Sequence, residues 1–150
     1  MKRLGKIAAV LLGVCMIMCM AVGCGGLDGT FTMKETVDVD YGDTTLHMPY
    51  YWELTVEGDT YEMIMTVDIS GGFAMCRGWT GKCSVDGNTV TCEKADKFFA
   101  YQATIETADD GTTSPKIDKT TKEETDAPAE GMGGAEKYTV DEKAGTFKRA

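Results

Sequence analysis

Apolar and polar side chains alternate along three stretches of the chain, residues 50–57, 61–70 and 99–105. Their apolar phases hold Tyr50, Trp52, Leu54 and Val56; Tyr61, Met63, Met65, Val67 and Ile69; and Phe99, Tyr101, Ala103 and Ile105. A period of two predicts β-strands that bury one face. No stretch keeps apolar residues at the i, i+3, i+4, i+7 spacing of a helix for three turns. The sequence therefore predicts an all-β fold.

A β-hairpin is predicted at TGKCSVDGNTVTCEK, residues 80–94. Gly87-Asn88 fits a two-residue turn that begins with glycine, as a type II′ turn requires. That register places Cys83 opposite Cys92 on one face, near enough to form a disulfide. Cys76 is then left free. The alternative is a pair of Cys76 with Cys83, which a turn centred on Trp79-Thr80 would place opposite each other.

Residues 107–136 have a different composition from the rest of the chain. Their only large apolar side chains are Ile117 and Met132, and eight acidic residues stand against three lysines. Such a segment buries too little apolar surface to offset the entropy cost of ordering it. We therefore expect a flexible, acidic, low-complexity insertion before the last strand.

The N-terminus has the pattern of a secretory signal peptide. MKRLGK carries Lys2, Arg3 and Lys6, and the next sixteen residues, IAAVLLGVCMIMCMAV, contain no charge. A basic start, an apolar run and small residues at its end are typical of a secretory signal. The run is slightly shorter than the roughly 20 residues that span a bilayer, although an uncleaved membrane anchor remains the alternative.

The end of this apolar run, Ala21-Val22-Gly23-Cys24, resembles the lipobox of bacterial lipoproteins. The resemblance implies that Cys24 receives a diacylglyceryl group, that residues 1–23 are removed, and that residues 24–28 form a short lipid tether. Two or more acyl chains give stable membrane anchoring. The residues after Cys24 resemble those of Gram-positive lipoproteins, which implies the extracytoplasmic face of a Gram-positive membrane.

The mature chain is strongly acidic. Removal of residues 1–23 leaves 12 basic and 24 acidic residues, a net charge of −12. This charge argues against nucleic acid as a partner, because binding phosphates requires lysine and arginine. It also repels an anionic lipid surface, so membrane attachment should depend on the acyl chains alone.

Three short motifs resemble those of small bacterial lipoproteins with a lipocalin-like, calycin-type barrel. They are Gly29-Thr30-Phe31, the hairpin from Gly81 to Cys92, and Gly145-Thr146-Phe147-Lys148-Arg149 near the C-terminus. The resemblance implies an antiparallel barrel of about eight strands, built from residues 29–106 and 137–150. It also implies that residues 30–37 pair antiparallel with residues 145–149, and that Arg149 packs over Phe31.

No catalytic or metal site is predicted. His47 is the only histidine, and no motif places a nucleophile and a carboxylate beside it. The cysteines lack the C-x₂-C spacing of zinc sites. Methionines such as Met63 and Met65 suit Cu(I) but lie on the apolar phase of a strand, where methionine fills gaps in a core. We therefore expect no enzyme activity, no metal and no cofactor.

The function predicted is that of a binding module. A barrel of this size either fills with its own side chains or holds one small ligand. A small apolar or aromatic molecule would contact the candidate residues Glu35, Trp52, Met63, Met65 and Tyr101. Glu35 lies on the apolar phase of the first strand, so it either faces the cavity or marks a β-bulge that turns it outward. The alternative function is a filled barrel that interacts with a protein partner.

Overall fold

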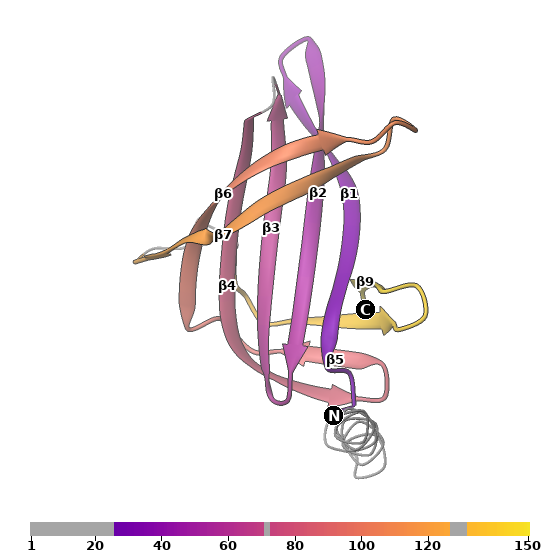
Figure 1. The fold of residues 1–150 in the computed structure, drawn as a ribbon, viewed down its shortest axis with the longest axis vertical. Coiled ribbons are helices and arrows are strands. Elements are labelled where there is room, and N and C mark those ends of the chain that lie inside the picture. Colours follow the sequence, from indigo (N-terminus) through magenta and orange to yellow (C-terminus); the bar gives the residue numbers. More distant parts are fainter. Residues whose placement is uncertain (1–25, 71–72, 127–131) are drawn as a thin grey trace, which may run out of the picture.

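The computed structural model describes residues 26–70, 73–126 and 132–150, and Cys24 with the predicted signal peptide lies outside these residues. The described residues form nine strands and no helix, so the all-β prediction is confirmed (Figure 1). The strands are β1 (Gly29–Tyr41), β2 (Thr44–Glu57), β3 (Thr60–Ser70), β4 (Phe73–Asp86), β5 (Thr89–Cys92), β6 (Lys97–Thr107), β7 (Thr113–Thr125), β8 (Glu136–Asp141) and β9 (Thr146–Arg149).

Seven of these strands close a barrel in the order β1-β2-β3-β4-β5-β8-β9, consistent with a lipocalin-like barrel. Each neighbouring pair is antiparallel except β9 and β1. A ring in which every neighbour is antiparallel needs an even number of strands. Seven strands can close only if one pair is parallel.

The contact that closes the ring is short. β1 pairs with β9 through one bridge, Thr32 with Thr146, and the Thr32 N–H donates to the Gly145 carbonyl oxygen at 3.0 Å. The prediction of an antiparallel pair was wrong, because residues 137–150 form the β8–β9 hairpin rather than a single strand. Gly145 lies in its turn with φ at +67°, so the chain reverses before β9.

The hairpin at Gly87-Asn88 has the predicted register. Cys83 lies opposite Cys92 and Val85 opposite Val90. Gly87 has φ at +62°, which glycine adopts without the steric cost that other residues incur.

The β6–β7 hairpin forms an arm across the outer face of the barrel. β6 extends the sheet beside β4, and Figure 1 shows the arm crossing in front of β4, β3, β2 and β1. The prediction that residues 107–136 are flexible was wrong for Thr113–Thr125, which form β7. Burial of apolar surface was the basis of that prediction, whereas β7 is held mainly by backbone pairing to β6 and by ion pairs to the barrel.

Two of these ion pairs connect distant parts of the sequence. Lys119 Nζ lies 2.9 Å from a Glu53 carboxylate oxygen on β2, and Lys122 Nζ lies 2.8 Å from Glu62 on β3. A small apolar cluster underneath contains Ile64, Cys76 and Tyr101. The arm is therefore an ordered layer of the fold.

The floor of the barrel is filled. Its core packs around Phe31, Leu54, Val56, Met63, Val90, Tyr138 and Phe147. Leu27 is only 2% exposed, and the Asp28 carboxylate accepts a hydrogen bond from the Gly58 N–H at 2.9 Å. The predicted tether of residues 24–28 is therefore too long, because Leu27 and Asp28 belong to the barrel.

Candidate functional site

The end of the barrel opposite this floor contains a cavity. Its volume is about 490 Å³, and it lies where β1 and β2 approach their shared turn and where β3 runs toward β4. We call it the mouth cavity. Its apolar wall consists of Val37, Tyr50, Trp52, Met65, Met75, Trp79 and Met132.

Aromatic rings line one side of the mouth cavity. Tyr50 stacks on Trp52 with ring centroids 6.3 Å apart, and Trp79 meets Trp52 edge to face at 6.1 Å. These offset arrangements are favoured by the quadrupoles of the rings. Because each ring packs against the next, the wall is held in place before any ligand arrives.

A polar cluster lies beside these rings. Arg149 donates one hydrogen bond to Glu35 at 2.7 Å and another to Glu136 at 2.9 Å. Glu35 also accepts a hydrogen bond from Trp52 Nε1 at 2.9 Å, and the Tyr138 hydroxyl donates to Glu136 at 2.8 Å. Each carboxylate therefore has two donors.

The polar cluster decides the position of Glu35. The register of β1 with β2 runs without interruption from Gly29 to Tyr41, so the alternative of a β-bulge at Glu35 is wrong. Glu35 lies on the cavity side and is 32% exposed. Its inward carboxylate is tolerated because Arg149 and Trp52 satisfy it.

Arg149 covers a different ring from the one predicted. Its guanidinium lies 5.1 Å from the centroid of Trp52, whereas Phe31 is buried in the core. Glu35 and Glu136 draw the guanidinium to this place. Burial opposes the charged form of Arg149, but the two carboxylates outweigh it and raise the pKa of Arg149 above its ordinary value.

The five predicted ligand contacts divide into two groups. Glu35, Trp52 and Met65 line the mouth cavity. Met63 is 0% exposed and fills the core, so it has no free surface for a ligand. Tyr101 is a residue of β6 in the arm and faces the outside of the barrel, where its hydroxyl donates to Glu62 at 3.4 Å.

Sequence reasoning missed several residues of the cavity. Met75 and Trp79 share a phase with Cys83 along β4, and extending the hairpin pattern toward the N-terminus would have found them. Met132 and Glu136 fall in the segment that was predicted to be flexible. No local sequence pattern predicts that these two residues line the cavity, because only the fold brings them to the mouth.

Cys76, Cys83 and Cys92, the three cysteines among the described residues, are free buried thiols in this structure. Cys83 and Cys92 face each other as predicted, at a non-hydrogen-bonded position of the hairpin, since the Cys83 N–H donates to the Asp59 carbonyl instead. Such positions bring Cα atoms to about 4.5 Å, within the range of disulfides. A disulfide here stays a prediction for oxidising surroundings.

The alternative pair of Cys76 with Cys83 is wrong, because β4 runs unbroken through Trp79-Thr80. Cys76 instead belongs to the cluster under the arm, where the Thr66 hydroxyl donates to its sulfur at 3.4 Å. Burial raises the thiol pKa of all three cysteines, and that of Cys92 reaches about 12. They are therefore protonated and weakly nucleophilic at neutral pH.

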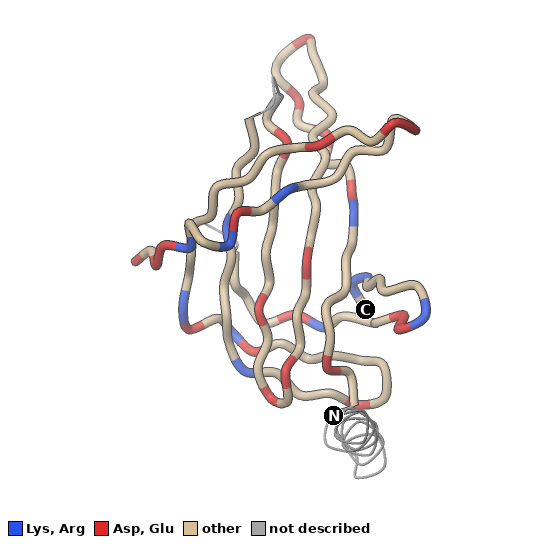
Figure 2. Tube along the Cα trace, in the orientation of Figure 1, with Lys and Arg blue, Asp and Glu red and all other residues tan. Residues whose placement is uncertain are grey.

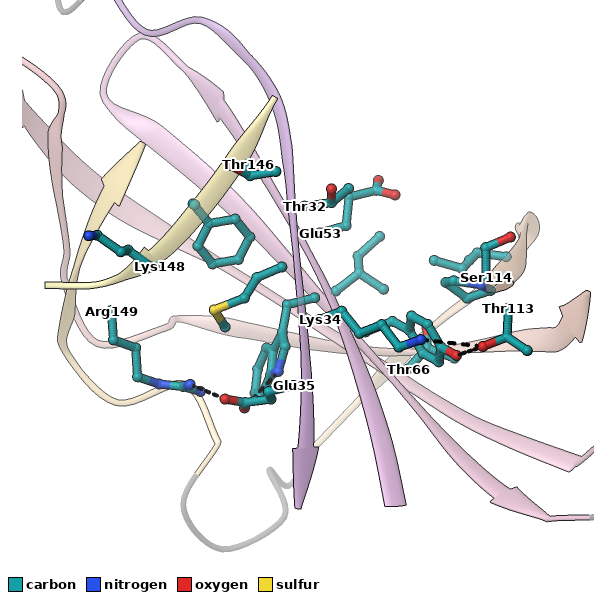
Figure 3. Close-up of a pocket in the computed structure, with 17 residues that line it drawn as sticks. Thr32, Lys34, Glu35, Glu53, Thr66, Thr113, Ser114, Thr146, Lys148 and Arg149 are labelled. Atoms are coloured by element: carbon teal, nitrogen blue, oxygen red, sulfur yellow. Dashed lines mark hydrogen bonds and ion pairs between the residues drawn. The ribbon is translucent and has the colours of Figure 1, made fainter. Parts of the chain in front are cut away.

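A second and larger hollow lies between the arm and the barrel. We call it the arm groove; its volume is about 740 Å³, and Figure 3 shows residues of β1, β7 and β9 around it. Glu35, Trp52 and Arg149 line both the arm groove and the mouth cavity. The pair of Glu35 and Arg149 thus stands between the two spaces, where β1 and β9 have separated after their single bridge.

His47 does not belong to either space. It is exposed on β2 and bonded through Nδ1 to Asp38 on β1. In the described part of the chain, no group of three or more His, Cys, Asp or Glu side chains is arranged to hold a metal ion.

Comparison with known proteins gave no match to a family model, a curated protein or a solved structure. Within the described residues, no helix is long and apolar enough to cross a membrane.

Proposed function

We propose that this protein is a lipid-anchored, extracytoplasmic lipoprotein whose barrel binds a small apolar or aromatic molecule in the mouth cavity. The observation that supports binding most is the contrast between a filled floor and a hollow mouth. A volume of about 490 Å³ lies within the range of sites for small molecules.

The cavity wall favours an aromatic or flexible apolar ligand. Trp52, Trp79 and Tyr50 offer flat faces, and the methionines adapt to irregular shapes because their side chains are flexible and polarizable. Glu35, Glu136 and Arg149 satisfy one another, so a ligand needs no strong charge to enter.

The proposed anchor sets an orientation. The first described residues lie at the floor end, beside β5, whereas the turn of β1 and β2 lies at the opposite end (Figure 1). An acyl chain on Cys24 is only two residues from Gly26. The floor would then face the membrane and the mouth would open away from it.

A neutral fluorescent probe, N-phenyl-1-naphthylamine, tests the cavity. Met75→Trp adds bulk to the wall and should raise the dissociation constant of the probe at least tenfold. Phe73→Trp is the matched control, because Phe73 lies two residues away on β4 and is 76% exposed outside the cavity. Equal affinities of the two variants would contradict the assignment.

Metabolic labelling with a fatty-acid probe tests the anchor. Cys24→Ala should abolish the label, because the thiol that accepts the diacylglyceryl group is gone. Label retained by the Ala variant would rule out lipidation at Cys24, without bearing on the cavity.

A protein partner is the second candidate, favoured by the rim. Five large apolar side chains are exposed beside the mouth, on the β1–β2 hairpin and at the ends of β3 and β4: Val37, Tyr41, Leu46, Ile69 and Phe73. Apolar side chains exposed together at one end of a protein are a feature of interaction sites. If the mouth cavity binds no small molecule, the rim becomes the better candidate.

A further inference from the structure

The arm groove differs from the rest of this acidic molecule in its balance of charge. Acidic residues lie at turns at both ends of the barrel (Figure 2). In the arm groove, however, Glu53 is neutralised by Lys119 and Glu35 by Arg149. Lys34 and Lys148 also line it, and among the described residues neither has a carboxylate within 4.0 Å. The groove therefore carries excess positive charge.

Lys34 is held at one end of the groove. Its Nζ lies 5.2 Å from the centroid of the Tyr51 ring and donates to the Thr113 hydroxyl at 3.5 Å. Figure 3 shows Lys34 reaching toward Thr113 and Ser114 on β7, on the other side of β1 from Glu35 and Arg149. An ammonium group has three donors, so two remain for a ligand. The Thr113 hydroxyl lies beside them and is also hydrogen-bonded to the Tyr51 hydroxyl.

The remainder of the groove is mostly apolar. Met33, Ile64, Pro115, Ile117 and Phe147 contribute to its lining. A hydrocarbon chain gains free energy when such surface removes it from water. One end of the groove thus suits an anion, and its walls suit a chain.

We infer that the arm groove binds a single-chain amphiphile with a carboxylate or phosphate head. The head lies against Lys34 and Thr113, and the chain follows Pro115 and Ile117, which are half-buried on the same side of β1. The arm groove shares Glu35, Trp52 and Arg149 with the mouth cavity, but the residues proposed to contact the head and the chain do not line that cavity, so the two proposals can fail independently.

Three eight-carbon probes test the site: octanoate, octyl phosphate and octyltrimethylammonium. They are titrated into the full chain, held in phosphatidylcholine nanodiscs, with methyl groups of isoleucine and methionine labelled for NMR. An anionic probe in the arm groove shifts Ile64 and Ile117, whereas a ligand in the mouth cavity shifts Met65, Met75 and Met132.

Lys34→Gln should weaken binding of the anionic probes about fivefold, since a charge contact of this exposure is worth about 1 kcal/mol. Lys34→Arg keeps the charge and should retain binding. Lys97→Gln is the matched control, because Lys97 is an exposed lysine at the far end of β6 that lines neither hollow. The affinity of the Lys97→Gln variant for the anionic probes should equal that of the unmodified chain.

The two anionic probes distinguish the head group: binding of either one supports the site, and the tighter one identifies the preferred head. The proposal is overturned if neither anion shifts the isoleucine methyls, if octyltrimethylammonium shifts them equally, or if Lys34→Gln binds as well as Lys97→Gln. Shifts confined to Met65, Met75 and Met132 would also overturn it, because they place the probe in the mouth.

Discussion

At the scale of single residues, Arg149 is the side chain that joins the most parts of the site. Its guanidinium bonds to Glu35 on β1 and Glu136 on β8 and covers Trp52 on β2. Removing it would leave two half-buried carboxylates without their cation. An unpaired charge in such a place costs more than the pair itself contributes.

Arg149→Met should therefore lower the free energy of unfolding by about 2 kcal/mol. Lys148→Met is its control, because Lys148 is the neighbouring residue on β9 and has no carboxylate within 4.0 Å in the described chain. We expect a change of less than about 0.5 kcal/mol for this control. Urea unfolding measures the free energy of unfolding of both variants. Equal decreases for the two would mean that the cluster of Arg149, Glu35 and Glu136 does not stabilise the fold.

Cys92 gives the reduced protein a dependence on alkaline pH. Burial raises its thiol pKa from 9.0 to about 12, so above pH 9 the unfolded chain releases a proton that the folded chain retains. The contribution of Cys92 to the free energy of unfolding is therefore complete below pH 9. It falls between pH 9 and about 12, by about 1.4 kcal/mol per pH unit.

Replacing Cys92 with alanine should make this decline shallower, although the cavity it leaves lowers stability at every pH. Urea unfolding with a reductant at pH 8, 9, 10 and 11 gives the two slopes. Parallel slopes for the two proteins would show that the Cys92 thiol ionises as readily in the folded state as in the unfolded state.

At the scale of elements, the arm depends on lysines that reach back to the barrel. Lys122 pairs with Glu62 and also lies 4.1 Å from the centroid of the Phe99 ring. Burial disfavours its charge, but the hydrogen bond to Glu62, the negative charge of Glu62 and the contact with Tyr101 together outweigh burial and raise the pKa of Lys122. The contact is thus among those that hold β7 against β3.

Lys122→Gln should speed hydrogen exchange of the β7 amides about fivefold and leave the β2 and β3 amides unchanged. The control is Lys116→Gln, which removes an exposed pair with Glu106 that lies within the arm itself. If both variants exchange alike, the lysine contacts to the barrel do not hold the arm.

The strands differ in how well they could be predicted from the sequence. The alternation of residues 50–57 and 61–70 predicted most of β2 and β3, and Gly87 fixed the register of β4 with β5. β7 escaped prediction because its partner charges, such as Glu53 for Lys119, lie 66 residues away in the chain. The direction of β9 escaped because Gly145 was interpreted as the start of a strand, whereas it ends the turn after β8.

The candidate site was predictable only in part, for the same reason. Trp52 and Met65 were found because they fall on the apolar phase of strands that alternate clearly. The partner of Glu35 was not found, because the pair depends on the seven-stranded closure that brings β9 alongside β1. The alternation of apolar and polar residues predicts which face of a strand is buried. Contacts between distant strands depend on how many strands close the barrel, which this alternation does not reveal.

At the scale of the whole molecule, the barrel has one filled end and one hollow end. The first residues of the described chain close the filled end, and the rim of exposed apolar side chains surrounds the hollow one. An anchor at Cys24 and a ligand at the mouth would therefore act at opposite ends. This division is the central claim of the proposed function.

Methionine-methyl NMR during titration with N-phenyl-1-naphthylamine tests that claim most directly, because methionines occupy both ends. Met65, Met75 and Met132 line the hollow, while Met63 lies in the filled core. We predict that the first three methyl signals shift in a saturable manner and that the Met63 signal stays in place. Unmoved signals for all four methionines would contradict a binding cavity at the mouth.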